Sequence, residues 1–145
     1  MVLGSLNPTD IQAFEIWIKT LNLSLKTFSQ ESNTDLNVKL YRGVSLADPN
    51  AIRNYTKGYS ICFPSFTSTS KSTGVANCFR GTESKTSILF EINLSERSRN
   101  CRASIEKISA FNEAEYLFGP FSTFVVQNIS QRLDQNFYEI SLEEI

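Results

Sequence analysis

The chain has 145 residues, enough for one domain that buries roughly two-thirds of its unfolded surface around a single core. Hydrophobic residues make up 41% of it and aromatic residues 12%, a composition that is typical of a packed globular protein and excludes a disordered one. The 14 basic and 15 acidic residues leave a net charge of −1 and form no basic run, so nucleic acid is not an expected partner.

Membrane and secretory signals are missing from this sequence. No apolar run approaches the roughly 18 residues that a membrane-spanning helix needs, and the first ten residues lack a basic patch followed by an apolar segment. We therefore expect no contact with a membrane, and a protein that stays in the cytoplasm or is delivered by another route.

The cysteine and histidine counts restrict the chemistry further. The three cysteines (Cys62, Cys78 and Cys101) have no CxxC spacing and leave at least one thiol unpaired, so we expect reduced thiols, with Cys62 and Cys78 in the core. The chain has no histidine, which excludes a Ser-His or Cys-His nucleophile pair, a histidine-bearing zinc site and imidazole acid-base catalysis. Any proton transfer must depend on carboxylates.

The first half of the chain predicts three helical segments around short strands. Apolar residues recur every three or four positions from 11 to 28 and predict an amphipathic helix, which Asn7-Pro8 or a Thr9 to Gln12 capping box can start. Alternating apolar residues over 36–41 predict a half-buried strand that ends at Arg42-Gly43. There follow a short helix within 48–59, a strand over 60–70 interrupted at Pro64, and a short helix over 73–79.

The second half predicts strands, because its apolar runs are rich in β-branched and aromatic residues. These runs cover 86–94, 116–118, 121–129 and 137–142. A chain with helices first and strands later predicts an α+β domain around an antiparallel or mixed sheet, rather than alternating βαβ units. We expect residues 1–145 to form one domain.

Two polar features stand beside predicted strands. Arg42 precedes a glycine, so a phosphate or ribose can approach both the guanidinium and the bare backbone. The hydroxyl run Thr67-Ser68-Thr69-Ser70 can donate hydrogen bonds to a carboxylate or a sugar. Each feature alone is more simply explained as structural, the first as an arginine at a strand end and the second as an edge strand rich in threonine.

An aromatic residue and a pair of carboxylates are the other two features. Phe79 can stack on a flat ligand ring, although a core position is the simpler explanation for a single phenylalanine. Glu113 and Glu115 stand two residues apart before an apolar run, so on a strand they share one face and repel each other. The pair alone can be a solvated strand start, but paired carboxylates also stabilise an oxocarbenium ion or position a cationic nucleophile.

The order of these features along the chain resembles that of a known family. Tyr41-Arg42-Gly43, then Phe66-Thr67-Ser68-Thr69-Ser70, then Glu113-Ala114-Glu115 is similar to the arginine, serine-threonine-serine and glutamate-x-glutamate motifs of the mono-ADP-ribosyltransferases. That family includes vertebrate ecto-enzymes and bacterial toxins. The segment 115–124, with its proline-aromatic turn, continues the resemblance, which covers roughly residues 38–126.

The resemblance implies roles for the residues of the first two motifs. Arg42 would bind the NAD phosphates and the nicotinamide-side ribose, and the Gly43 backbone would hold the nicotinamide carboxamide. Ser68 would hydrogen-bond Glu115 and fix its rotamer, while Thr69 and Ser70 would support the sheet and the nucleotide pocket.

It also implies roles for the later residues. Phe79 would contact nicotinamide, and Glu115 would bind the ribose 2′-hydroxyl and stabilise the oxocarbenium ion as nicotinamide leaves. Glu113 would engage the acceptor guanidinium, since in this family glutamate at that position goes with arginine acceptors. Phe111 lies in the segment that corresponds to the family's substrate-recognition loop, 105–112.

As a whole, the resemblance implies a catalytic domain in which two packed sheets form an NAD cleft. The expected activity is transfer of ADP-ribose from NAD to an exposed arginine of a protein acceptor by a monomer that needs no metal. Two alternatives stay open at this point: an NAD glycohydrolase, in which water takes the same cation, and a catalytically silent domain that binds NAD or a protein. Retention of two like charges close together is an argument against the silent domain.

Overall fold

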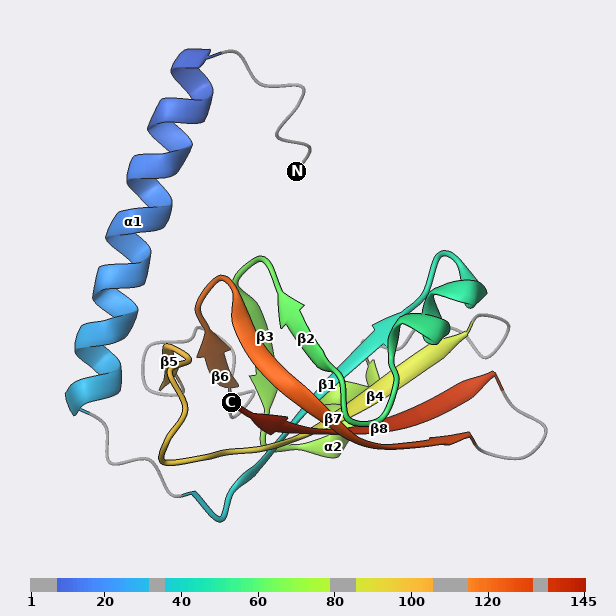
Figure 1. Cartoon of the computed structure of the whole chain (residues 1–145). Helices are drawn as coiled ribbons and strands as arrows, with labels where there is room; N and C mark the ends of the chain where they lie inside the picture. The colour runs from blue at the N-terminus through green and yellow to red at the C-terminus, as the bar shows by residue number, and fades with distance from the viewer. Residues whose placement is uncertain (1–7, 32–35, 79–85, 106–114, 132–135) are drawn as a thin grey trace.

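The computed structural model of the chain describes residues 8–31, 36–78, 86–105, 115–131 and 136–145. The described elements in chain order are α1 (Pro8–Glu31), β1 (Lys39–Ser45), the 3-10 helix η2 (Pro49–Asn54), β2 (Ser60–Phe63), β3 (Thr67–Ser70), α2 (Thr73–Cys78), β4 (Ser87–Asn93), β5 (Arg102–Ser104), β6 (Glu115–Phe118), β7 (Ser122–Gln131) and β8 (Phe137–Glu144). A helical N-terminal part followed by a mixed sheet confirms the predicted α+β class (Figure 1).

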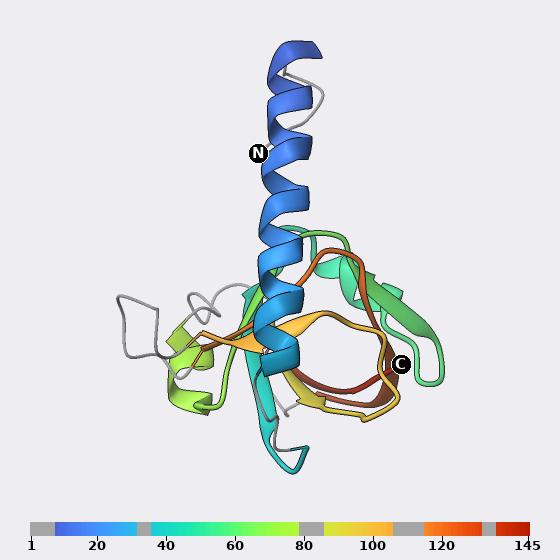
Figure 2. The ribbon, with the colours of Figure 1, turned by 90° about the vertical axis from the view of Figure 1, so that its left-hand side faces the viewer.

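Helix α1 stands away from the strands over much of its length (Figures 1 and 2). It begins at Pro8, a residue that the first turn of a helix accommodates because that turn needs no donor there. Leu25, on the predicted apolar stripe, is 3% exposed, whereas Ile16 and Leu23 are largely exposed. Within the described residues, the closest packing of α1 is against β5, so this helix contributes little to the cleft described below. Among the described helices, none is both long and apolar enough to cross a membrane.

The strands form one mixed sheet in the order β2-β7-β8-β4-β1-β3-β6-β5. β4 and β8 run parallel, and the other neighbouring strands run antiparallel. β1 pairs with β4 along all seven of its residues, but its register with β3 contains one pair, Tyr41 with Ser70. The two sheets expected from the resemblance are therefore two parts of one sheet, joined at this narrow pairing.

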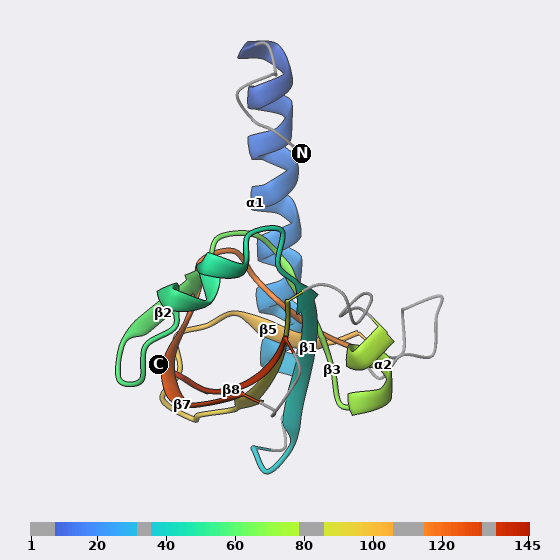
Figure 3. The same cartoon turned by 90° about the vertical axis from the view of Figure 1, so that its right-hand side faces the viewer.

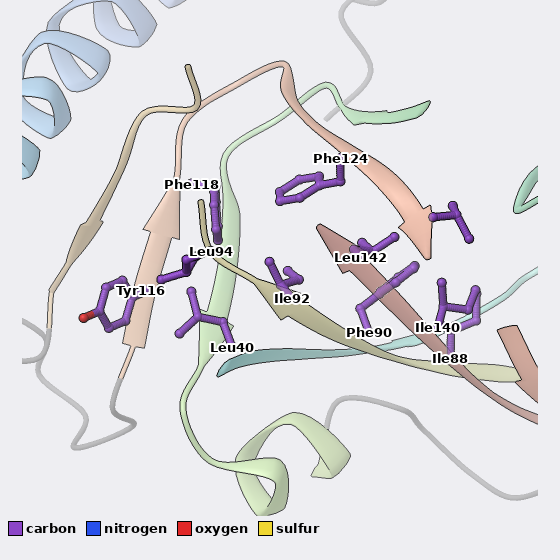
Figure 4. Packing of buried hydrophobic residues seen from close by; sticks show 11 residues of the cluster. Leu40, Ile88, Phe90, Ile92, Leu94, Tyr116, Phe118, Phe124, Ile140 and Leu142 are labelled. Carbon is purple, nitrogen blue, oxygen red and sulfur yellow. The ribbon is translucent and has the colours of Figure 1, made fainter. Parts of the chain in front are cut away.

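The sheet curves so that its two parts share one core (Figures 3 and 4). Phe118 of β6 and Phe124 of β7 come from different parts of the sheet, yet their rings lie edge to face with centroids 5.4 Å apart. The buried side chains alternate along the strands, as period-two patterning requires. The cluster comprises Leu40, Ile88, Phe90, Ile92, Leu94, Tyr116, Phe118, Phe124, Val126, Ile140 and Leu142.

Several local expectations differ from the structure. β1 continues to Ser45, so Arg42 and Gly43 lie inside the strand rather than at its end, because β4 pairs with its full length. The helix expected within 48–59 is the 3-10 helix η2, and the strand expected over 60–70 is divided around Pro64 as predicted. Cys62 is exposed on β2, so its expected core position is wrong.

Candidate active site

A cleft of about 490 Å³ opens beside the narrow pairing of β1 with β3. Residues from β1, β3, β6 and α2 line it, and seven of them belong to the motifs found in the sequence. The lining comprises Tyr41, Arg42, Gly43, Val44, Ser45, Ser68, Thr69, Ser70, Ala76 and Glu115. The cleft thus brings together motif residues that are up to 74 positions apart in the chain, from Tyr41 to Glu115.

Arg42 is held between the two strands that flank β1. It shares a face of β1 with the buried Leu40, because side chains two residues apart on a strand point the same way. Its Nη1 donates a hydrogen bond of 3.0 Å to the carbonyl oxygen of Ser68 on β3. Burial lowers the pKa of Arg42 from its ordinary value, although the guanidinium keeps its charge at neutral pH. A partly desolvated cation of this kind interacts strongly with a bound phosphate.

Ser68 and Glu115 are diagonal neighbours on β3 and β6. Ser68 lies opposite Leu117, and Ser70 lies opposite Glu115, so Ser68 and Glu115 share one face of the sheet. The hydroxyl of Ser68 donates a hydrogen bond to Oε1 of Glu115, as the resemblance implies. Ser68 therefore contacts Arg42 through its carbonyl and Glu115 through its side chain.

The backbone of Gly43 is directed toward the cleft. The N–H of Leu46 donates to the carbonyl of Thr86 immediately beyond the β1–β4 register. Hydrogen-bonded and non-hydrogen-bonded pairs alternate in antiparallel strands, so even-numbered residues of β1 bond toward β4. Gly43 and Ser45 consequently point their N–H and C=O groups to the opposite side, where the register with β3 has already ended at Tyr41. These groups are placed to bind an amide.

Thr69 and Ser70 also line the cleft, but their hydroxyls have structural partners. The Thr69 hydroxyl is buried and donates to the carbonyl of Tyr116 at 3.0 Å, which ties β3 to β6. The Ser70 hydroxyl accepts a hydrogen bond from the N–H of Ser72 just before α2. Both contacts fit the expected support of the sheet and pocket.

Three of the sequence-predicted residues, Phe79, Phe111 and Glu113, lie outside the described residues, and their roles stay predictions. Conversely, the cleft includes Tyr41, Val44, Ser45 and Ala76, to which the family resemblance assigned no role. The signal for Tyr41 and Ser45 was the period-two alternation itself, which places both on the same face of β1 as Gly43.

Within the described part of the chain, no group of three or more acidic or cysteine side chains is placed to hold a metal ion.

Comparison with known proteins gives a family match over most of the chain. The model of the family described as NAD:arginine ADP-ribosyltransferase matches residues 11–145. No curated protein matches the chain significantly by sequence.

Solved structures show the same fold at low sequence identity. The ADP-ribosyltransferase Vis from Vibrio splendidus, in complex with agmatine, superposes with a TM-score of 0.73 and 23% identity, covering 95% of this chain and 60% of that one. The ATR domain of Salmonella SpvB gives 0.69 and 17%, covering 97% and 76%. The C3 exoenzyme of Clostridium limosum gives 0.66 and 18%, covering 96% and 71%. The present chain thus spans about 60% of the length of Vis.

Proposed function

The chain belongs to the NAD:arginine ADP-ribosyltransferase family, and on that premise we propose that it transfers ADP-ribose from NAD to an arginine side chain of a protein acceptor. The observation that carries this proposal is the linkage of Arg42 and Glu115 through Ser68 at one cleft. Residues 1–145 would form one catalytic domain that acts as a monomer, with NAD as co-substrate and no metal.

Arg42 and Gly43 would bind NAD on the two sides of the bond that breaks, Arg42 on the ADP-ribose side and Gly43 on the nicotinamide side. The guanidinium would pair with the diphosphate, and its partial burial would strengthen that interaction. The N–H and C=O of Gly43, which point away from β4, match the acceptor and donor of a carboxamide. NAD held at both places would have its ribose near Glu115.

Glu115 would stabilise the charge that develops as the glycosidic bond breaks. The electron pair of the C1′–N bond leaves with nicotinamide, and C1′ becomes an oxocarbenium ion that a nearby carboxylate stabilises. The hydrogen bond from Ser68 would fix the rotamer of Glu115 before NAD binds, which lowers the cost of reaching that geometry. A guanidinium nitrogen then attacks C1′ and loses a proton.

The acceptor side of the reaction is proposed from the family resemblance. Glu113 would orient the acceptor guanidinium, Phe111 would lie in the loop that recognises the protein acceptor, and Phe79 would pack on nicotinamide. One of the similar structures, that of Vis, is a complex with agmatine, which carries a guanidinium group. Agmatine is therefore a suitable small acceptor with which to test the chain.

The test is product analysis with NAD and agmatine. We expect ADP-ribosyl-agmatine and free nicotinamide from the unmodified protein. Glu115→Gln should remove both transfer and NAD hydrolysis, a loss of at least about a hundredfold, because an uncharged amide does not stabilise the cation. Glu96→Gln, which changes an exposed carboxylate outside the cleft, is the matched control and should react normally. Free ADP-ribose without labelled agmatine or protein would instead identify an NAD glycohydrolase, and NAD binding without turnover a silent domain.

A further inference from the structure

Tyr55 lies beside the candidate site although it belongs to none of the sequence motifs. It directly follows η2, and its N–H donates to the carbonyl of Ile52 at 3.1 Å, which fixes its backbone. Its ring is half-buried and packs against the hydrophobic core. Tyr55 is therefore an ordered residue whose side chain has a defined neighbourhood.

That neighbourhood includes Arg42. The ring of Tyr55 packs on Phe90, with centroids 5.5 Å apart and planes inclined by 59°. Phe90 is the residue of β4 directly opposite Arg42, and directly opposite residues of paired strands lie side by side on one face of the sheet. Arg42 thus has the Ser68 carbonyl on its β3 side and the Phe90–Tyr55 pair on its β4 side.

The two side chains also interact electrostatically. Burial raises the pKa of the Tyr55 phenol from its ordinary value, and the charge of Arg42 opposes this in part. The phenol is therefore protonated at neutral pH, so it does not compete with an anionic ligand for the guanidinium. A neutral phenol that is close enough to interact with the Arg42 charge leaves that charge available to a ligand.

We propose that Tyr55 is a positioning residue for Arg42, which acts by holding the guanidinium in the orientation that binds the NAD diphosphate. The ring restricts the long side chain and the hydroxyl offers it a polar neighbour. An arginine that is ordered before NAD binds loses less side-chain entropy on binding. This inference rests on the proposed function, since it assumes that Arg42 binds NAD.

The test compares Tyr55→Phe with Tyr59→Phe in the full chain. Tyr59 lies four residues away and is 67% exposed, so it controls for loss of a phenol from this segment. We expect Tyr55→Phe to raise the Kd and KM for NAD about three- to tenfold, with kcat and the melting temperature nearly unchanged, as for loss of one polar contact. Tyr59→Phe should leave all four quantities unchanged.

A double-mutant cycle then asks whether Tyr55 acts through Arg42. If it does, Tyr55→Phe should weaken NAD binding much less in an Arg42→Lys background than in the unmodified protein. Unchanged NAD affinity in Tyr55→Phe, or a full additive loss in the double variant, would overturn the positioning role alone. Failure of the unmodified protein to bind NAD would overturn the proposed function as well, so the two failures are distinguishable.

Discussion

At the scale of residues, Ser68 connects Arg42 to Glu115 through two different groups of its own. Its carbonyl accepts from Arg42, while its hydroxyl donates to Glu115. The backbone contact survives any substitution of the side chain, whereas the hydroxyl contact does not. The two contacts can therefore be separated by mutation, which allows the proposed roles of Arg42 in NAD binding and of Glu115 in the chemical step to be tested one at a time.

Ser68→Ala should lower kcat far more than it weakens NAD binding. Glu115 would lose the donor that fixes its rotamer, and a catalytic group that is free to rotate reaches its reactive position less often. We expect kcat for nicotinamide release to fall about ten- to a hundredfold, with the Kd for NAD changed less than about threefold because Arg42 keeps its partner. Ser60→Ala on β2 is the control, and an equal loss of binding and turnover in Ser68→Ala would contradict this division.

Glu113→Gln should separate transfer from hydrolysis. The substitution removes the charge proposed to orient the acceptor guanidinium, but it leaves in place Glu115, the residue proposed to stabilise the cation. Transfer to agmatine should fall at least about tenfold relative to NAD hydrolysis, because hydrolysis does not use the guanidinium. Nicotinamide and ADP-ribosyl-agmatine are measured in the same reaction, and a parallel loss of the two products would show that the acceptor role is wrongly assigned.

The sequence could predict the motif residues of the site but not their supporting neighbours. Arg42, Ser68 and Glu115 were recognisable because each belongs to a short motif whose order is itself informative. Tyr55 carries no such signal, because its place beside Arg42 depends on Phe90 in a different strand. The core position expected for Cys62 was wrong because Ile61 and Phe63 on either side of it pack against the core, so the alternation of β2 places Cys62 on the opposite, exposed face.

At the scale of elements, alternation and β-branched or aromatic content together predicted the described strands except β5. This strand has three residues, Arg102–Ser104, and begins with a charged side chain that a propensity argument places in solvent. The structure buries Arg102 because its Nε donates to Glu144 at 3.0 Å. Glu144 comes from β8, 42 residues later in the chain, so no local window contains the information that explains β5.

Glu144 should be a large contributor to stability for the same reason. Its side chain is buried and accepts hydrogen bonds from the Ser95 N–H, the Ser98 hydroxyl, the Asn100 amide and Arg102. Glu144→Gln leaves a buried guanidinium without a counter-charge, so we expect the free energy of unfolding to fall by about 3 kcal/mol in a urea titration. Glu143→Gln, at the exposed neighbouring position, should cost less than about 1 kcal/mol. Similar losses in the two variants would mean that the buried network is not stabilising.

At the scale of the whole molecule, the cleft results from how the sheet is joined. β8 returns to lie parallel to β4 and antiparallel to β7, which completes one part of the sheet, and β3-β6-β5 form the other. Because β1 and β3 pair at Tyr41 and Ser70 and then diverge, the backbone beyond Tyr41 is left facing a cavity. Strand order and this divergence depend on pairings between distant segments, so local patterns in the sequence could not supply them.

Binding of NAD in this cleft should stabilise the whole fold whether or not catalysis follows. A ligand that binds the folded state alone, at a hundred times its Kd, adds about 2.7 kcal/mol, which corresponds to a rise in melting temperature of roughly 5–10 °C for a chain of this size. Differential scanning fluorimetry should show this rise for the unmodified protein and for Glu115→Gln, because that variant keeps Arg42 and the backbone groups of Gly43. At the same NAD concentration Arg42→Lys should show at most about half of it, since lysine lacks the forked guanidinium that pairs with a diphosphate. An equal rise in Arg42→Lys would show that NAD binds elsewhere on the molecule, and loss of the rise in Glu115→Gln would show that Glu115 serves binding rather than the chemical step.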